Sequence, residues 1–393
     1  MPRWSSFGQF LDDVNAAAPA ERQALVEELL REHPVFPWVD GDEATFVYHG
    51  MDADTVALNL DTINADPPFA PMMRIPNTAL WYVRRQFQRD DLLDYLLAVN
   101  DPMTPLRGET NLVKRVSDHW RIDPLNPQRV ETPQASVSVL RMPNARPFPD
   151  WASFRRVPRG KVSEQSIDSE HMGYKGRRVW VYTPFGYDAD ATYPLLVMLD
   201  GQWATGPLQM PAIADALIKH HQMQPAIIAM IQSSSDIERN REYISNDKHY
   251  EFLIRELVPF MQTRHHIGEV AIMGVAVGAI GAAHAALINP DTFSALGMIS
   301  PPLGKGQFQE ELSYYYKRFA SADRLPKRVF QSVGRFETPA RFYKPAHDLQ
   351  RVLQSRKNVD YHFIETGSGH GLVGFRGILP EAMAWLLPGD ADE

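Results

Sequence analysis

The chain has 393 residues, of which 44% are hydrophobic and 22% charged, and a formal net charge of −8 at pH 7. This length exceeds that of most single cores, so we expect two domains in an ordinary globular protein. The acidic balance disfavours nucleic acid and anionic membranes as main partners. The absence of cysteine excludes disulfides, thiol catalysis and thiolate metal sites.

The first residues carry charges throughout and lack the apolar centre of a secretory signal. No stretch approaches the roughly 18 apolar residues of a membrane span. We therefore expect a cytoplasmic protein without a membrane partner.

Residues 1–34 are predicted to form helices, because apolar residues such as Phe7, Phe10 and Val14 recur at helical spacing. Residues 35–141 change to short alternating or aromatic segments, among them EATFVYHG, TVALNLD and TALWYVRRQF, with turn-rich stretches between them. This pattern is typical of a small antiparallel β-sandwich.

A linker and an α/β domain are expected next. The stretch 142–160 is rich in proline and has no periodicity, which indicates a linker. Residues 161–390 alternate apolar strands such as YPLLVMLD, PAIIAMI and EVAIMG with helical segments near 211–222, 247–263, 277–288, 341–356 and 376–387. Such alternation predicts a mostly parallel, doubly wound sheet with helices on both faces.

The stretch EVAIMGVAVGAIGAAHAAL, residues 269–287, begins as an apolar strand, turns at Gly274 and continues as a helix rich in small residues. It has the frame of the α/β-hydrolase nucleophile elbow, in which small residues flank a serine on a strained turn. Gly274 and Gly278 satisfy this frame, but Ala276 stands at the nucleophile position, and a methyl group cannot attack a carbonyl. Standing alone, the two glycines are equally consistent with close helix packing.

Two further residues lie where such a hydrolase needs them. His370, between Gly369 and Gly371, separates the last predicted strand from the last predicted helix and is the candidate base. Glu337 follows a predicted strand, so the chain order is nucleophile, acid, histidine, as this fold requires. Asp348 is an alternative acid, although its place in a predicted helix favours a solvated charge.

An oxyanion hole requires backbone N–H groups beside the nucleophile and at the end of a neighbouring strand. The segment LLVMLDGQWA ends such a strand at Gly201 and Gln202. The amides of Gln202 and Val277 are therefore the expected pair, with Asp200 stabilising the turn.

These motifs together resemble the enterochelin (enterobactin) esterase family of esterase-D-like α/β-hydrolases. The resemblance is carried by YPLLVMLDGQWA, MGVAVGAIGAAHAALINPDTFSALGMIS, VGRFETP and GSGHGLVGFRG, and in the N-terminal half by EATFVYHG, MMRIPNTALWY and LLDYLLAVNDPMTPL. It covers about residues 35–390. It implies cytoplasmic hydrolysis of ester bonds in a cyclic tri-ester or similar siderophore, a small-molecule ester or ferric siderophore as the partner, and no metal or organic cofactor.

By position, the resemblance places Ala276 on the nucleophilic serine, His370 on the catalytic histidine and Glu337 on its acidic partner. Gly201 and Gln202 fall on the oxyanion loop.

Arg239 and Arg241 match a basic pair at the border of the family's site, where forked hydrogen bonds suit an anionic or catecholate substrate. Salt bridges to Glu238 or Glu242 that order a loop are the alternative. Trp203 matches an aromatic residue after the oxyanion loop. It is a candidate for stacking on an aromatic acyl group, although core packing is the favoured interpretation.

The chain departs from the family at two places. The elbow reads GVAVGA instead of GxSxGG, and Gly371 stands where an acid commonly follows the histidine. Three explanations of Ala276 remain open: a non-catalytic relative that binds a ligand or partner, an esterase whose serine was replaced, or another nucleophile such as Ser300 or one of the serines 233–235. We expect weak or no esterase activity, with a carbohydrate or feruloyl esterase as the alternative substrate class.

Overall fold

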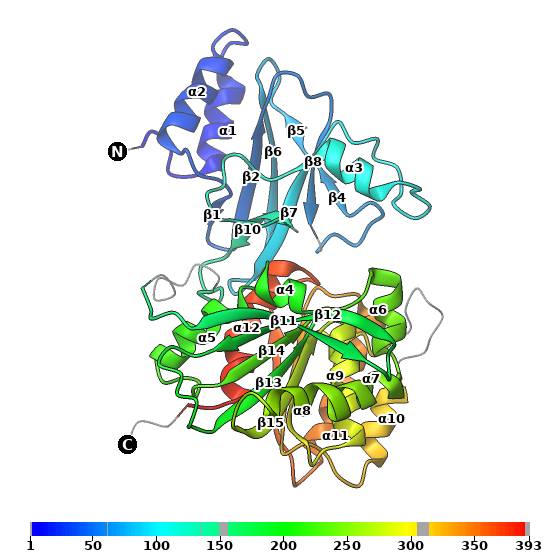
Figure 1. The fold of residues 1–393 in the computed structure, drawn as a ribbon. Helices are drawn as coiled ribbons and strands as arrows, with labels where there is room; N and C mark the ends of the chain where they lie inside the picture. The colour runs from blue at the N-terminus through cyan, green and yellow to red at the C-terminus, as the bar shows by residue number, and fades with distance from the viewer. Residues whose placement is uncertain (1, 61, 134, 149–155, 305–313, 390–393) are drawn as a thin grey trace. The chain divides into compact units, whose positions relative to one another are not determined.

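The computed structural model describes residues 2–60, 62–133, 135–148, 156–304 and 314–389 (Figure 1). These residues form two compact units. The first unit holds the described residues up to Arg146 together with Gly367–Gly374, and the second holds the remainder. Part of the expected linker, 149–155, lies outside the described residues.

The first unit begins with the helices α1 (Phe7–Ala16) and α2 (Arg22–Glu32), which confirms the helical prediction for this region. The hydroxyl of Ser6 accepts a hydrogen bond from the N–H of Gln9 and so caps α1. Figure 1 shows both helices beside the sheet that contains β2 and β6. Their apolar faces pack in one cluster with strand residues: Phe7, Phe10, Val14, Val26, Leu29, Val47 and Leu80.

Two antiparallel sheets follow in the first unit, as the sequence predicts. One has the order β1 (Trp38–Asp40), β2 (Glu43–His49), β6 (Leu80–Gln86) and β5 (Met73–Arg74). The other has the order β4 (Phe69–Pro71), β3 (Val56–Leu60), β7 (Leu92–Val99), β10 (Ser136–Arg141) and β9 (Arg129–Glu131), with β8 (Trp120–Arg121) paired to β7. The rings of Phe46 on β2 and Tyr95 on β7 meet at a centroid distance of 4.9 Å and join the two sheets. The helix α3 (Leu112–His119) was not expected.

The second unit is built on a mixed sheet that has eight strands among the described residues. Their order is β11 (Lys161–Ser169), β12 (Tyr174–Thr183), β14 (Ile227–Ile231), β13 (Tyr193–Leu199), β15 (Ile267–Val275), β16 (Phe293–Ile299), β17 (Arg328–Gly334) and β18 (Asp360–Thr366). The pairs formed by β12 are antiparallel, and all other pairs are parallel. The predicted mostly parallel sheet is therefore confirmed.

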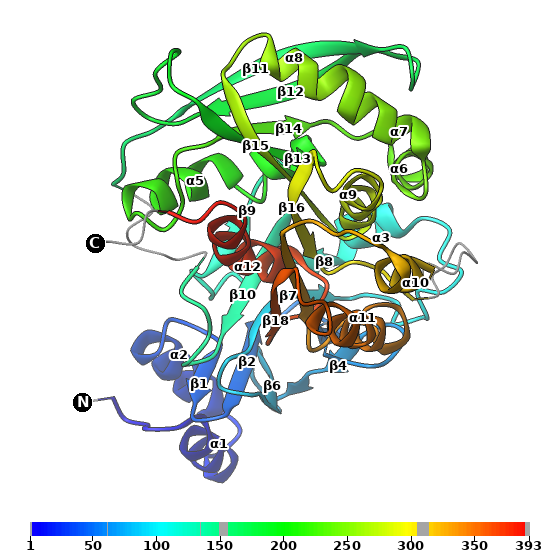
Figure 2. The ribbon, with the colours of Figure 1, turned by 90° about the horizontal axis from the view of Figure 1, so that it is seen from below.

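Helices cover both faces of this sheet, as Figure 2 shows. One face carries α5 (Met210–Lys219) and α12 (Leu372–Leu386). The other carries α6 (Asp236–Tyr243), α7 (Asp247–Phe252), α8 (Val258–Gln262), α9 (Val277–Ile288), α10 (Tyr314–Ser321) and α11 (Lys344–Gln354). Strand side chains at alternate positions, such as Leu195, Val197 and Leu199, are fully buried in the core beneath α9.

The short helix α4 (Gly201–Thr205) directly follows β13. The prediction of a loop around ERNREY is wrong, because this segment forms α6. None of the helices described here has the length and apolar character that a membrane span needs.

Candidate active site

Ala276 lies on a sharp turn between β15 and α9. Its backbone angles are φ 52° and ψ −124°, a region that is unfavourable for any residue with a Cβ atom. The turn is held on both sides, because the Ala276 N–H donates to the carbonyl of Ile299 at 2.9 Å and the Ala276 carbonyl accepts from the N–H of Ala279 at 3.0 Å. The backbone of a nucleophile elbow is thus present without its hydroxyl group.

The two flanking glycines are required by close packing. A Cβ atom on Gly274 would lie 2.2 Å from the carbonyl carbon of Gly278, and one on Gly278 would lie 2.6 Å from Oδ2 of Asp200. Neither distance is sterically possible for a real side chain. The predicted need for small residues on both sides of position 276 is therefore confirmed.

The expected oxyanion loop follows β13. A Cβ atom on Gly201 would lie 2.5 Å from the backbone of Met230, so only glycine fits at the start of α4. The side chain of Gln202 donates to Oγ of Ser233 at 2.6 Å and accepts from the Ser233 N–H at 3.1 Å. This double contact fixes the loop. The amides of Gln202 and Val277 lie in the first turns of α4 and α9, where N–H groups lack an intrahelical partner, and their oxyanion role stays a prediction.

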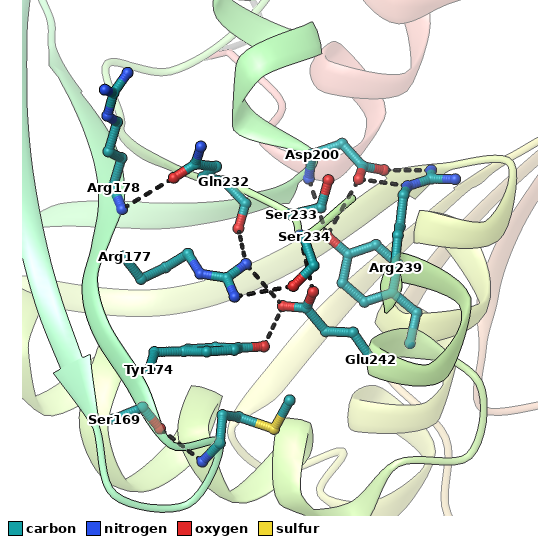
Figure 3. Close-up of polar contacts among 12 residues, drawn as sticks. Ser169, Tyr174, Arg177, Arg178, Asp200, Gln232, Ser233, Ser234, Arg239 and Glu242 are labelled. Carbon is teal, nitrogen blue, oxygen red and sulfur yellow. Dashed lines mark hydrogen bonds and ion pairs between the residues drawn. The ribbon is translucent and has the colours of Figure 1, made fainter. Parts of the chain in front are cut away.

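Arg239 forms an ion pair that the sequence did not reveal. Its Nε and Nη2 atoms donate to the two carboxylate oxygens of Asp200 at 2.6 and 2.5 Å (Figure 3). Asp200 is only 3% exposed and has a φ of 62°, and the hydroxyl of Tyr243 also donates to it at 3.2 Å. Because Nη2 of Arg239 also reaches the carbonyl of Val275 at 3.4 Å, this pair supports the elbow from below.

Arg241 behaves differently. It is largely exposed and pairs with Glu238 at 2.8 Å, one of the two salt bridges anticipated as the alternative to substrate binding. Asp348 likewise lies in α11 and pairs with Arg351 on the surface, which fits a solvated helix charge.

A buried network centred on Glu242 was also missed. One carboxylate oxygen accepts from the hydroxyl of Tyr174 and from Arg177 at 3.2 Å, and the other accepts from the N–H of Ser234 at 3.0 Å (Figure 3). Arg177 also donates to the carbonyl of Gln232 at 2.9 Å and to Oγ of Ser234 at 3.0 Å. Burial, together with the Glu242 charge, raises the pKa of Tyr174 above its ordinary value, so this hydroxyl remains a donor.

This network holds the loop between β14 and α6 against β12. The same loop presents Ser233 to Gln202, so the order of the oxyanion loop depends on it. Ser233 and Ser234 both have structural partners, which favours a structural role over the alternative that one of them is the nucleophile. The sequence analysis missed this network because Arg177 and Glu242 lie far apart in the sequence.

Glu337 lies in the turn after β17 and is only 2% exposed. Its Oε1 atom accepts from the hydroxyl of Ser300 at 2.5 Å and from the N–H of Gly334 at 3.0 Å. Ser300 is buried and has a φ of 51°. The geometry favours Ser300 as a support of the candidate acid over its earlier interpretation as an alternative nucleophile.

His370 lies in the loop between β18 and α12, in the segment Gly367–Gly374 that belongs to the first unit. Ala276 and Glu337 belong to the second unit. Trp203 on α4 remains 40% exposed, so the prediction that it packs in the core is wrong. Over the part of the chain that the structure describes, histidine and acidic side chains form no group suited to a metal ion.

Comparison with protein families gives two matches. Residues 169–386 match the family described as "Putative esterase", and residues 43–151 match the N-terminal domain of enterochelin esterase.

Iron(III) enterobactin esterases are among the curated relatives that are similar to this chain. An iron(III) enterobactin esterase of Escherichia coli O6:H1 is 29% identical over 180 residues, and the match spans 44% of each protein. An iron(III) enterobactin esterase of Dickeya dadantii is 24% identical over an alignment of 393 positions, gaps included, that covers 89% of this chain and 86% of that protein.

The fold is shared with solved structures. The enterobactin esterase of Shigella flexneri, solved in the presence of enterobactin, superposes with a TM-score of 0.71 over 88% of this chain and 92% of that chain, at 23% sequence identity. The fold is thus established as an α/β-hydrolase domain that follows an N-terminal β-domain in the chain. The chain belongs to the esterase family matched by residues 169–386, and its N-terminal domain is similar to that of enterochelin esterase.

Proposed function

We propose that this chain binds an ester of the tri-lactone siderophore type and that Ala276 leaves it with weak or no hydrolytic activity. One observation carries the proposal: the strained turn of the elbow is retained, with φ 52° and ψ −124°, while its central side chain is a methyl group. In this proposal the backbone of the elbow is kept while the attacking oxygen is lost.

The chemistry follows from the roles that this fold gives its residues. A serine hydroxyl attacks the ester carbonyl, a histidine takes the hydroxyl proton, an acid orients the histidine, and backbone N–H groups stabilise the oxyanion. In this proposal His370, Glu337 and the amides of Gln202 and Val277 keep these roles. Loss of the nucleophile alone removes a factor of about 10⁶ from turnover, and the oxyanion donors and substrate binding leave a small residual rate.

The substrate class rests on the combination of domains. The relative from Dickeya dadantii that matches 89% of this chain is an iron(III) enterobactin esterase, and the N-terminal domain matches the enterochelin type. This combination favours a ferric tri-catecholate siderophore, or its metal-free lactone, over sugar or feruloyl esters. A pseudoesterase that binds a partner protein is the alternative.

Binding and hydrolysis are tested separately. We expect ferric enterobactin to quench the tryptophan fluorescence of the native chain in a saturable way, while chromatography detects little or no cleavage of the lactone. Ala276→Ser is expected to restore hydrolysis and labelling by a fluorophosphonate probe. Ala276→Gly is the matched control, because it fits the same turn without supplying a hydroxyl.

Three results would oppose the proposal. Strong fluorophosphonate labelling of the native chain would show that another residue is the nucleophile. A folded Ala276→Ser variant that cleaves neither the siderophore nor simple aryl esters would remove the support for Glu337 and His370, and absence of quenching would reject the siderophore as the ligand.

A further inference from the structure

The loop that carries His370 is attached to one strand of the first unit at two places. The carbonyl of Gly367 accepts from the N–H of Leu92 at 2.8 Å. Beyond the histidine, the N–H of Val373 donates to both carboxylate oxygens of Asp94 at 3.0 and 3.1 Å. Leu92 and Asp94 are two positions apart on β7, so His370 lies between two anchors on a single strand.

The glycines of this loop allow an unusually close approach to β7. A Cβ atom on Gly371 would lie 2.9 Å from both Cγ and Oδ2 of Asp94. One on Gly367 would lie 2.8 Å from the carbonyl oxygen of Asp90 and from Oδ1 of Asp91. The glycine immediately after His370 is therefore matched to the carboxylate of Asp94, which occupies the space of a side chain at that position.

Asp94 is well suited to fix the loop. Val373 lies in the first turn of α12, where N–H groups have no intrahelical partner and the helix dipole favours a negative charge. The carboxylate of Asp94 satisfies one of these donors and so determines where the helix begins, two residues after His370. The strand β7 is itself paired on both sides, with β3 and β10, which makes it a rigid support.

We propose that Asp94 is a positioning residue for His370: through Val373 and Gly371 it fixes the loop from which the candidate base acts. This inference rests on the proposed role of His370 as the base, and Asp94 acts through the loop without itself entering the reaction.

The catalytic test uses the Ala276→Ser background. Asp94→Ala is expected to lower kcat by about tenfold to 100-fold, because a displaced catalytic group loses its alignment, while KM changes by less than about twofold. Asp94→Asn keeps one acceptor oxygen and is expected to lose less. Asp40→Ala is the matched control, since Asp40 is an exposed strand carboxylate of the same unit. An unchanged kcat in Asp94→Ala would overturn the proposal.

A second test needs no activity and uses the native chain. The imidazole proton resonance of His370, assigned with His370→Gln, should shift or broaden in Asp94→Ala, and the amide of Val373 should exchange faster with deuterium. Asp40→Ala should change neither. If Asp94→Ala does not fold, Asp94→Asn serves in both tests. Should the Ala276→Ser variant prove inactive, the proposed function fails, but an unaltered His370 resonance is still needed to reject the role of Asp94.

Discussion

Replacing Arg239 by methionine tests whether the ion pair beneath the elbow is a structural clamp. The side chain of Asp200 is 5% exposed and that of Arg239 20% exposed, so the carboxylate is shielded from water on nearly all sides. Arg239→Met leaves this carboxylate buried with the Tyr243 hydroxyl as its remaining side-chain donor at 3.2 Å. Breaking a buried pair in this way costs about 3–5 kcal/mol of unfolding free energy, and we expect the lower end because Tyr243 remains.

The assay is urea unfolding of the native chain and the variants, in which the unfolding transition of the second unit is monitored. Arg241→Met is the matched control on the same helix, since the side chains of Arg241 and Glu238 are 74% and 55% exposed. An exposed pair of this kind contributes about 0–1 kcal/mol. The double variant Asp200→Asn with Arg239→Met should recover part of the loss, because no unpaired charge is then left buried.

Equal losses of stability in Arg239→Met and Arg241→Met would rule out a structural clamp. A double variant less stable than Arg239→Met alone would rule it out as well. Either result would mean that Arg239 does not keep its ion pair with Asp200 in solution and is available to bind a substrate.

Two further predictions concern buried polar groups. Ser300→Ala removes a donor from the carboxylate of Glu337 and should lower the unfolding free energy by about 1–3 kcal/mol in urea titrations, whereas an unchanged midpoint would contradict the role given to Ser300. Burial, with a smaller effect of the Arg177 charge, lowers the pKa of His249 to about 3. In the unfolded chain this histidine binds a proton near pH 6.5, whereas in the folded chain it stays neutral there. Stability should therefore fall by about 1.4 kcal/mol per pH unit as the pH decreases from 6.5 towards 3, and His249→Gln should flatten this slope in unfolding curves measured across that range, with equal slopes opposing the assignment.

The sequence predicted the features that depend on local pattern. The strands β13, β14 and β16 are nearly continuous in hydrophobic residues. The glycines at 274 and 278 identify the elbow because both allow a contact below 3 Å. The outer strand β11 was not predicted. Most of its residues are polar and exposed, so the run of apolar residues that indicates a strand is missing.

Features that depend on contacts between residues far apart in the chain were not predicted from the sequence. The helix α6 is charged around most of its surface and has no apolar stripe, so it reads as a loop. Its stability comes instead from Arg239 and Glu242, whose partners Asp200 and Arg177 lie on other elements. The return of the His370 loop to the first unit depends in the same way on Asp94, which is 279 residues from Val373.

The strain at Ala276 bears on whether the lost serine altered the fold. A non-glycine residue in such a conformation costs about 1–3 kcal/mol and persists only where the surroundings fix it. Here they do, since Gly274 and Gly278 pack backbone against backbone and the Ala276 N–H is bonded to Ile299 across the sheet. None of these contacts involves a side chain at position 276. The turn is therefore maintained by packing and does not depend on the catalytic hydroxyl, which is why a serine placed there should find the elbow already formed.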